Sequence, residues 1–335
     1  MSLYWRVAVS ILLVLGCRGD ADTAAFRVGL ITPGSIADAA WNSGAYQGLT
    51  QIRDSMGVDV SHVEAKTPGA QEEALRTYAA QGYDLVFGHG FEFQDMAERV
   101  APDFPNTIFI ITSGIRAVGQ VSPMIFRLEE ASYLAGMVAG GMTRSGIIGF
   151  VGGIELPPIR AAYDGWVNGA RAVNPAVEPR LIYINTFEDA AAGREAALAL
   201  IRLGADMIHH NADAAALGVF QAVKESPAVY VFGANADQSA LAPERVLGSA
   251  VIDLPRAFLT VAREVTAGAF TPRVESFGLA SGVIQYVENP TTAVLIPPAL
   301  ESQVEAAADS ISQGLLDPIA PRPPAPGPTR GGGTS

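Results

Sequence analysis

A short segment near the N-terminus places an acid, an aromatic ring and an amide close together, at Asp38, Trp41 and Asn42. An indole stacks well on a planar ligand, and a carboxylate beside an amide can hydrogen-bond the polar edge of that ligand. A structural interpretation is equally open. In it, Asp38 or Asn42 caps the helix that follows, and Trp41 fixes that helix to a sheet. The residues by themselves favour neither interpretation.

Further candidate binding residues follow later apolar segments. Gly90 would let the backbone approach a ligand closely, and Phe91 would form a wall beside it. Phe187, Asn211 and Asp237 each follow a predicted strand in the second half of the chain. In parallel sheets the loops after the strands gather at one edge, so these residues are expected to line a common cleft.

The sequence offers no recognisable catalytic or metal-binding arrangement. No serine stands in a Gly-x-Ser-x-Gly elbow, and neither Lys66 nor Lys224 belongs to a phosphate-binding Gly-Lys-Ser/Thr loop. His209 and His210 are neighbours on a predicted strand, so their side chains point to opposite faces. We therefore predict a binding protein without catalytic residues, cofactor or metal. An exported nucleoside or glycoside hydrolase that uses Asp38 or Asp237 as acid or base is the enzymatic alternative.

Residues 1–16 have the pattern of a lipoprotein signal peptide. Arg6 precedes an apolar run over 7–15 that is too short to span a bilayer, and a small residue precedes Cys17, the single cysteine of the chain. This arrangement resembles a bacterial lipobox, so we expect a lipidated Cys17 that anchors the protein on the extracytoplasmic side of a membrane. The alternative is an ordinary secretory signal. Export by either route argues against a gene regulator.

Composition narrows the partners further. The 335 residues include 34 acidic and 22 basic residues, which gives a net charge of −12. Such a chain will not bind nucleic acid by neutralising its phosphates. Residues 318–335 are rich in Pro and Gly and offer nothing to pack, so they are expected to be disordered, and 17–25 are expected to form a tether.

Apolar segments alternate with helical patterns along the body of the chain. Residues 107–111 are apolar without alternation, as in parallel strands that are covered on both faces. Strand–helix alternation predicts parallel sheets with right-handed crossovers. An irregular stretch over 113–123 separates two such series, so two sheets fit better than one.

We therefore predict an α/β protein with the type I periplasmic-binding-protein fold, in which two doubly wound parallel-sheet lobes are joined by a three-strand hinge. The ligand cleft would lie between the lobes. The predicted crossings lie at 124–127, near 249 and near 281. The predicted N-terminal lobe comprises 26–125 and 250–280, and the C-terminal lobe comprises 126–249 and 281–317.

Five motifs occur in a characteristic order along residues 26–287. They are Asp38-x-x-Trp41-Asn42, Gly88-x-Gly90-Phe91, Glu130-Ala-Ser-Tyr133-Leu-Ala-Gly136-Met-Val-Ala-Gly140, Phe187-x-Asp189 and Gly233-x-x-x-Asp237-Gln238. Together they resemble the basic membrane protein (BMP, PnrA-like) family, whose members are lipoprotein receptors of ABC importers. The run that begins at Glu130 is the most specific of the five.

The resemblance implies a purine nucleoside as ligand. Its base would stack between aromatic rings at positions that match Trp41 and either Phe187 or Trp166, although the helical setting of Trp166 favours packing. Asn42 would bind the base edge, and Asp237 would hold the ribose hydroxyls. The resemblance also implies capture by hinge closure and delivery to an ABC permease, and we expect a monomer. A sensory receptor of the same fold that signals to a membrane partner is the alternative.

Three positions depart from the family pattern. An acid usual after the first strand is Pro33, an aspartate usual at the end of the strand over 107–112 is Thr112, and a lysine usual soon after Ser249 is Ile252. Each lost polar contact is of a class worth about 1–3 kcal/mol. We therefore predict a purine nucleoside or a related planar solute, and keep Thr112 and Ser249 among the candidate ligand-binding residues.

Overall fold

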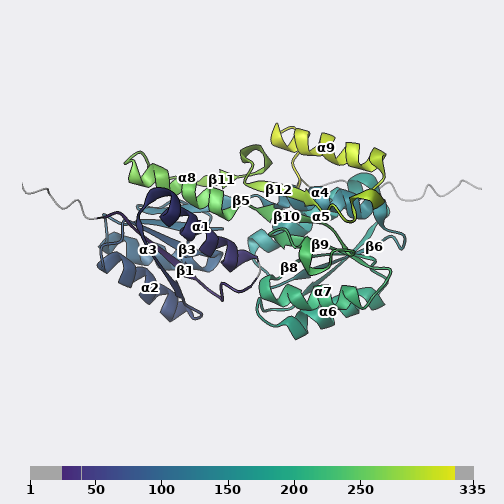
Figure 1. The fold of residues 1–335 in the computed structure, drawn as a ribbon, viewed down its shortest axis with the longest axis horizontal. Helices are drawn as coiled ribbons and strands as arrows, with labels where there is room; N and C mark the ends of the chain where they lie inside the picture. Colours follow the sequence, from purple (N-terminus) through teal and green to yellow (C-terminus); the bar gives the residue numbers. More distant parts are fainter. Residues whose placement is uncertain (1–24, 39, 321–335) are drawn as a thin grey trace, which may run out of the picture.

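The computed structural model describes residues 25–38 and 40–320. The predicted signal peptide, Cys17, nearly all of the tether, and the tail from residue 321 lie outside these residues. The described chain forms two α/β lobes side by side, each built on its own sheet (Figure 1). None of its helices is long and apolar enough to cross a membrane.

The first sheet contains six strands in the order β11-β5-β4-β3-β1-β2, all of them parallel. Its strands are β1 (Arg27–Thr32), β2 (Asp59–Glu64), β3 (Leu85–His89), β4 (Ile108–Thr112), β5 (Val121–Phe126) and β11 (Glu275–Phe277). Its helices are α1 (Trp41–Met56), α2 (Pro68–Ala80), α3 (Gln94–Val100) and α8 (Leu254–Thr266), the last packed against α1. We call this unit the N-terminal lobe. Every residue of β3 is buried, as expected for a central strand covered by helices on both faces.

The second sheet has the order β12-β10-β9-β8-β6-β7, and only β12 is antiparallel to its neighbour. Its strands are β6 (Ile147–Gly152), β7 (Glu178–Tyr183), β8 (Met207–Asn211), β9 (Tyr230–Asn235), β10 (Val246–Ile252) and β12 (Ile284–Glu288). Its helices are α4 (Leu128–Met142), α5 (Pro157–Val173), α6 (Ala190–Arg202), α7 (Ala216–Lys224) and α9 (Pro298–Ser312). We call this unit the C-terminal lobe. The predicted fold class is thereby confirmed.

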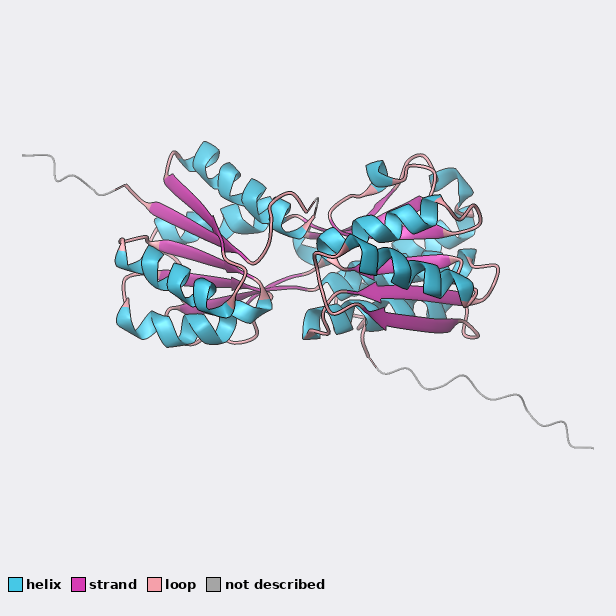
Figure 2. Ribbon diagram, turned by 90° about the horizontal axis from the view of Figure 1, so that it is seen from below, coloured by secondary structure: helices cyan, strands magenta, loops and turns pink. Residues whose placement is uncertain are grey.

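Three chain segments join the lobes (Figure 2). They lead from β5 to α4, from β10 to α8, and from β11 to β12. Two of them are tied together at Glu130, whose carboxylate accepts a 2.6 Å hydrogen bond from the Leu279 amide and lies 3.1 Å from the Arg127 guanidinium. The Arg127 amide in turn donates to the carbonyl of Phe277. These bonds hold the hinge segments in register while leaving each lobe a separate body.

Glycines set the distance between α4 and α5. A Cβ at Gly136 would lie 2.1 Å from the carbonyl oxygen of Trp166, and one at Gly140 would lie 2.4 Å from that of Ala170. On the facing helix, a Cβ at Gly169 would lie 1.9 Å from the Tyr133 carbonyl oxygen. The two backbones therefore touch, which explains why the run from Glu130 to Gly140 needs glycine at these positions.

Two strands differ from the sequence-based expectation. Residues 121–126 form β5, which begins within the stretch expected to be irregular and continues into the predicted crossing, and residues 275–277 form β11 at the edge of the first sheet. Between β11 and β12, a short 3₁₀ turn at Leu279–Ser281 carries the chain from one lobe to the other. β11 has three residues, too few for a periodic pattern.

Candidate functional site

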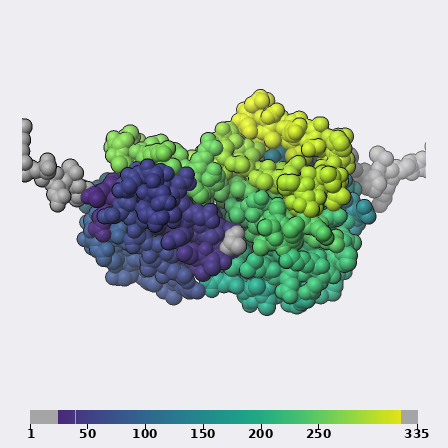
Figure 3. Space-filling model, in the orientation of Figure 1, coloured from purple at the N-terminus to yellow at the C-terminus, as the bar shows by residue number. Residues whose placement is uncertain are grey.

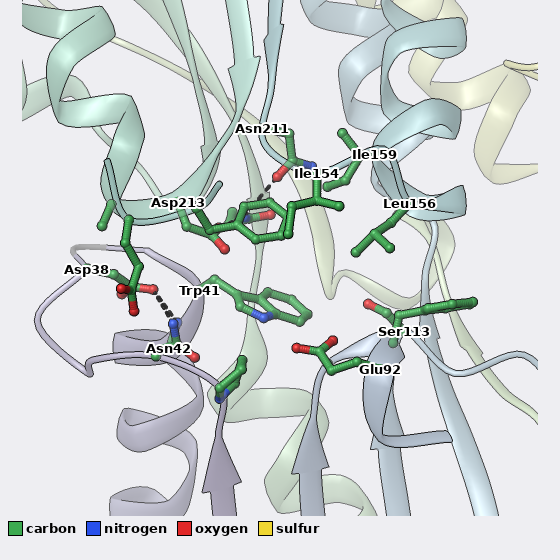
Figure 4. Close-up of a pocket in the computed structure, with 18 of the residues that line it drawn as sticks. Asp38, Trp41, Asn42, Glu92, Ser113, Ile154, Leu156, Ile159, Asn211 and Asp213 are labelled. Atoms are coloured by element: carbon green, nitrogen blue, oxygen red, sulfur yellow. Dashed lines mark hydrogen bonds between the residues drawn. The ribbon is translucent and has the colours of Figure 1, made fainter. Parts of the chain in front are cut away.

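A cavity of about 610 Å³ lies between the lobes, within the size range of small-molecule sites. Residues of both lobes line it, mostly from loops that follow strands (Figure 4). In the space-filling view the two lobes are in contact (Figure 3). Apolar side chains cover part of the wall: Phe126, Leu128, Ile154, Leu156, Ile159 and Ile252.

Seven of the residues singled out from the sequence line this cavity. They are Asp38, Trp41, Asn42, Gly90, Phe91, Phe187 and Asn211. Four others do not line it: Thr112, Trp166, Asp237 and Ser249. The structure thus brings together the loops after β1, β3, β7 and β8, as the topology requires of parallel strands that end at one edge.

Trp41 is held from behind by His89. The two rings stack with their centroids 4.0 Å apart, and the indole meets Phe126 edge-on at 6.0 Å. His89 Nε2 donates to the Trp41 carbonyl at 3.1 Å, and His89 Nδ1 accepts from the Thr112 hydroxyl at 3.0 Å. Burial lowers the pKa of His89 to about 3, so the ring is neutral and these partners fix its tautomer. Thr112 therefore acts on the cavity only through His89.

Asp38 organises the loop that carries Trp41. One carboxylate oxygen accepts from the amides of Ala40 and Ser43, and the other accepts from the backbone and side-chain N–H groups of Asn42, all at 2.7–3.1 Å. The charge thus faces the N-terminus of α1, where unpaired amides and the helix dipole favour an anion. The geometry supports the capping interpretation of Asp38, although the residue also borders the cavity.

Four residues with left-handed backbone conformations surround the cavity. Ser113, Asn185, Asp213 and Asn235 have φ between 46° and 66°, and they are the non-glycine residues with positive φ within 25–38 and 40–320. All four line the cavity. Each lies at or just beyond the end of a strand, where the turn aims a polar side chain inward. Strained positions of this kind collect at functional sites.

The C-terminal lobe contributes a connected polar group at the ends of β8 and β9. The Asn235 side chain donates to Asp213 at 3.1 Å and to Asn211 at 3.4 Å. Sequence reasoning did not select Asn235 and preferred Asp237, two residues further on. Asp237 is exposed and bonds Ser239 in the next turn, because β9 ends at Asn235 and the chain then leaves the cavity.

Two acids from opposite lobes point into the space beside Trp41 (Figure 4). Burial raises the pKa of Asp213 to about 8, and the nearby charges of Asp38 and Glu92 add to the effect. Desolvation also raises the pKa of Glu92. Neither acid was selected from the sequence. The φ of 46° at Asp213 is a signal that only coordinates reveal.

An ion pair closes one side of the cavity. Lys66 Nζ, in the N-terminal lobe, lies 3.3 Å from Glu188 of the C-terminal lobe and 3.2 Å from Glu64 of its own lobe. These partners raise the pKa of Lys66. The pair bridges the two lobes directly, and the lobes are therefore in contact in this conformation.

The remaining predicted residues support the cavity from a distance or not at all. Trp166 is fully buried and packs against His209 and Phe232 in the core of the C-terminal lobe. Ser249, fully buried on β10, accepts from the amide of Gln238 and so shapes the loop after β9. Across the described chain, no three His, Cys, Asp or Glu side chains lie close enough to hold a metal ion.

The two sheets, the three connections and the cavity between the lobes define a two-lobed binding protein of the periplasmic type. A solved ABC-transporter solute-binding protein from Aeropyrum pernix K1 has the same fold, with a TM-score of 0.80 at 23% identity over 86% of this chain and 92% of that chain. The family of PnrA-like ABC-transporter substrate-binding proteins matches residues 25–304. The chain belongs to this family, and the resemblance drawn from its motifs is confirmed.

Two relatives share most of their length with the chain. Basic membrane protein A2 of Borrelia garinii is 28% identical over 317 residues, which cover 92% of this chain and 93% of the relative. A purine-binding protein of Brucella abortus is 26% identical over 309 residues, which cover 91% and 86%. The chain is thus a substrate-binding protein of the ABC-transporter type, a class of protein that binds small-molecule ligands and works with permeases.

Proposed function

We propose that this protein is a lipid-anchored, extracytoplasmic receptor that captures a purine nucleoside or a related planar solute for an ABC importer. The observation that carries the proposal is the half-buried indole of Trp41, backed by His89 and lining an interlobe cavity of about 610 Å³. A ring that is fixed before the ligand arrives lowers the entropy lost on binding. The purine-binding relative from Brucella abortus supports a planar ligand.

Hinge closure is the proposed mechanism. Trp41 and Phe91 come from the N-terminal lobe, whereas Phe187 and Asn211 come from the C-terminal lobe. A solute that touches both sets stabilises the closed form relative to the open form, and the permease then distinguishes the loaded receptor by its shape. The three connections at Phe126, Ile252 and Phe277 are where the backbone would bend.

A thermal-shift panel of purine bases, nucleosides, sugars and amino acids tests the ligand class. A ligand at about 100 times its dissociation constant stabilises the fold by ~2.7 kcal/mol, which shifts the melting temperature by a few degrees. We expect a rise with purine nucleosides or bases and none with sugars or amino acids. A rise confined to sugars would contradict the planar-solute proposal.

The anchor is tested separately in cells. The wild-type protein is expected in the membrane fraction, with the acyl groups detected on the N-terminal peptide by mass spectrometry. Cys17→Ser should move it to the soluble extracytoplasmic fraction. A wild-type protein that is already soluble would favour an ordinary secretory signal.

A further inference from the structure

The charges around the cavity do not balance. Among the described residues that line it, Asp38, Glu92, Glu188 and Asp213 are acids, and Lys66 is the single base. Lys66 is paired with Glu188, and the Asp38 oxygens are occupied by four N–H groups at the start of α1. Glu92 and Asp213 are left without a cationic partner, one from each lobe.

The cavity lining also contains an unpartnered acceptor. Asn42 is 5% exposed, and its Oδ1 has no hydrogen-bond partner. The orientation of the amide is determined, because Nδ2 must donate to the acceptor-only carboxylate of Asp38. Oδ1 is therefore the free atom, and it can be satisfied only by a donor. A buried acceptor left unpaired costs about 1–3 kcal/mol, so a ligand that supplies an N–H group would gain affinity.

The cavity walls suit a cation as well as a flat ring. Trp41, Phe91, Phe126 and Phe187 all line the cavity, and aromatic faces attract cations through their quadrupoles. The hinge residue Ile252 borders the same space with an apolar side chain and adds no positive charge.

We propose that the solute captured in this cleft is a planar heterocyclic cation, with its charge placed between Glu92 and Asp213 and an N–H group directed at Asn42 Oδ1. N-methylated purine nucleosides in their cationic form belong to this class. The inference rests on the proposed function, since it names the charge of the solute that the receptor would capture.

The titration of the two acids is consistent with this arrangement. Burial raises the pKa of Asp213 to about 8, and repulsion from the nearby Asp38 and Glu92 adds to the shift. A cation between Glu92 and Asp213 would reverse the shift, because a nearby opposite charge favours the ionised carboxyl. A neutral solute would not reverse the shift.

Calorimetric titration of the mature protein with two isomers at neutral pH tests the charge directly. 1-Methyladenosine is cationic and N6-methyladenosine is neutral, while their size and stacking surface are the same. We expect the cationic isomer to bind roughly tenfold tighter or more, because hydrogen bonds to ionised groups are about twice as strong as neutral ones. Guanosine and 7-methylguanosine, compared in mildly acidic buffer in which the methylated ring keeps its N1 proton and is cationic, form a second pair with the same expected order.

Variants assign the preference to the two acids. Glu92→Gln and Asp213→Asn should each reduce the ratio of the two affinities by about tenfold. Asp309→Asn is the control, since it removes one negative charge from an exposed position on α9, outside the cavity. It should leave the ratio unchanged. Circular dichroism and thermal melting of each variant identify a loss of fold.

The outcomes separate this inference from the proposed function. Equal or tighter binding of the neutral isomers would overturn the cationic ligand and leave the planar-solute receptor standing. A cationic preference that survives in both acid variants would overturn the roles of Glu92 and Asp213. Binding of neither member of either pair would overturn the inference, and a flat response to the whole purine panel would overturn the proposed function with it.

Discussion

The imidazole of His89 lies parallel to within 25° behind the indole of Trp41, with 4.0 Å between the ring centroids. The histidine is fully buried and is bonded at both nitrogens, to the Trp41 carbonyl and to the Thr112 hydroxyl. With a pKa lowered by burial to about 3, it does not change charge across the physiological range. The cavity therefore has an aromatic wall whose position is set by the fold before any ligand binds.

The first prediction concerns Thr112, which reaches the cavity only through His89. Thr112→Val keeps the shape of the side chain but leaves His89 Nδ1 without its donor, so the free energy of unfolding should fall by about 1–3 kcal/mol. The affinity for a planar ligand should also fall, because the support behind Trp41 is loosened. Urea unfolding and calorimetric titration measure the two effects.

Thr107→Val is the matched control for this change. Thr107 is also buried and donates to a carbonyl, that of Tyr83, but it lies outside the cavity. It should lose comparable stability with no change in ligand affinity. If both variants bind ligand as the wild type does, Thr112 has no positioning role.

The second prediction separates two tryptophans that the sequence could not distinguish. Trp166→Ala should lower the free energy of unfolding by about 3–5 kcal/mol, because it empties a fully buried core position. Trp41→Ala should cost less stability and abolish most of the ligand-induced thermal shift. A Trp41 variant that retains the full shift would show that the indole does not carry the binding.

Much of the architecture could be predicted from the sequence. Fully apolar strands such as β4 and the alternation of strands and helices indicate two parallel sheets, and a parallel sheet fixes which loops meet. That rule, together with residue chemistry and the family motifs, places Asp38, Trp41, Asn42 and Phe91 at the cavity. The rule fails in two places. The strand β11 is too short to show a periodic pattern of apolar residues. At the end of a strand, the backbone conformation of a single residue determines which side chain points into the cavity.

The loop after β9 shows the physical reason. Asn235 and Asp237 are both polar, and sequence alone favours the acid as the stronger hydrogen-bonding group. The left-handed conformation at Asn235, with φ of 66°, turns this residue into the cavity and the following ones away from it. Such a conformation is common for asparagine but is not required by it, so it could not be predicted from the residue type.

The third prediction concerns the contact between Lys66 and Glu188 across the cleft. Lys66→Met removes the single ion pair seen between the lobes in the described residues, so the open form should become more populated. Small-angle X-ray scattering of the ligand-free protein should give a larger radius of gyration. High salt should produce part of the same change in the wild type, since both partners are exposed.

Lys224→Met is the control, because it also removes one positive charge. Lys224 is the last residue of α7 and does not line the cavity. It should leave the radius of gyration unchanged. If the Lys66 variant also scatters as the wild type does, the ion pair has no influence on closure.

The last prediction is a pH dependence centred on Asp213. Its pKa is about 8 in the folded chain and about 3.9 in an unfolded chain, so the folded state holds its proton longer. The ligand-free protein should therefore lose stability as the pH rises from about 4 through about 8. Asp213→Asn removes this loss, and its melting temperature relative to the wild type should climb over that interval. Asp38 and Glu92, which face Asp213, remain in both proteins. Asp237→Asn changes an exposed residue outside the cavity, so its melting temperature should vary with pH in parallel with that of the wild type. A wild-type profile that coincides with that of Asp213→Asn from acid to alkaline pH would mean that Asp213 is not held protonated in the cleft.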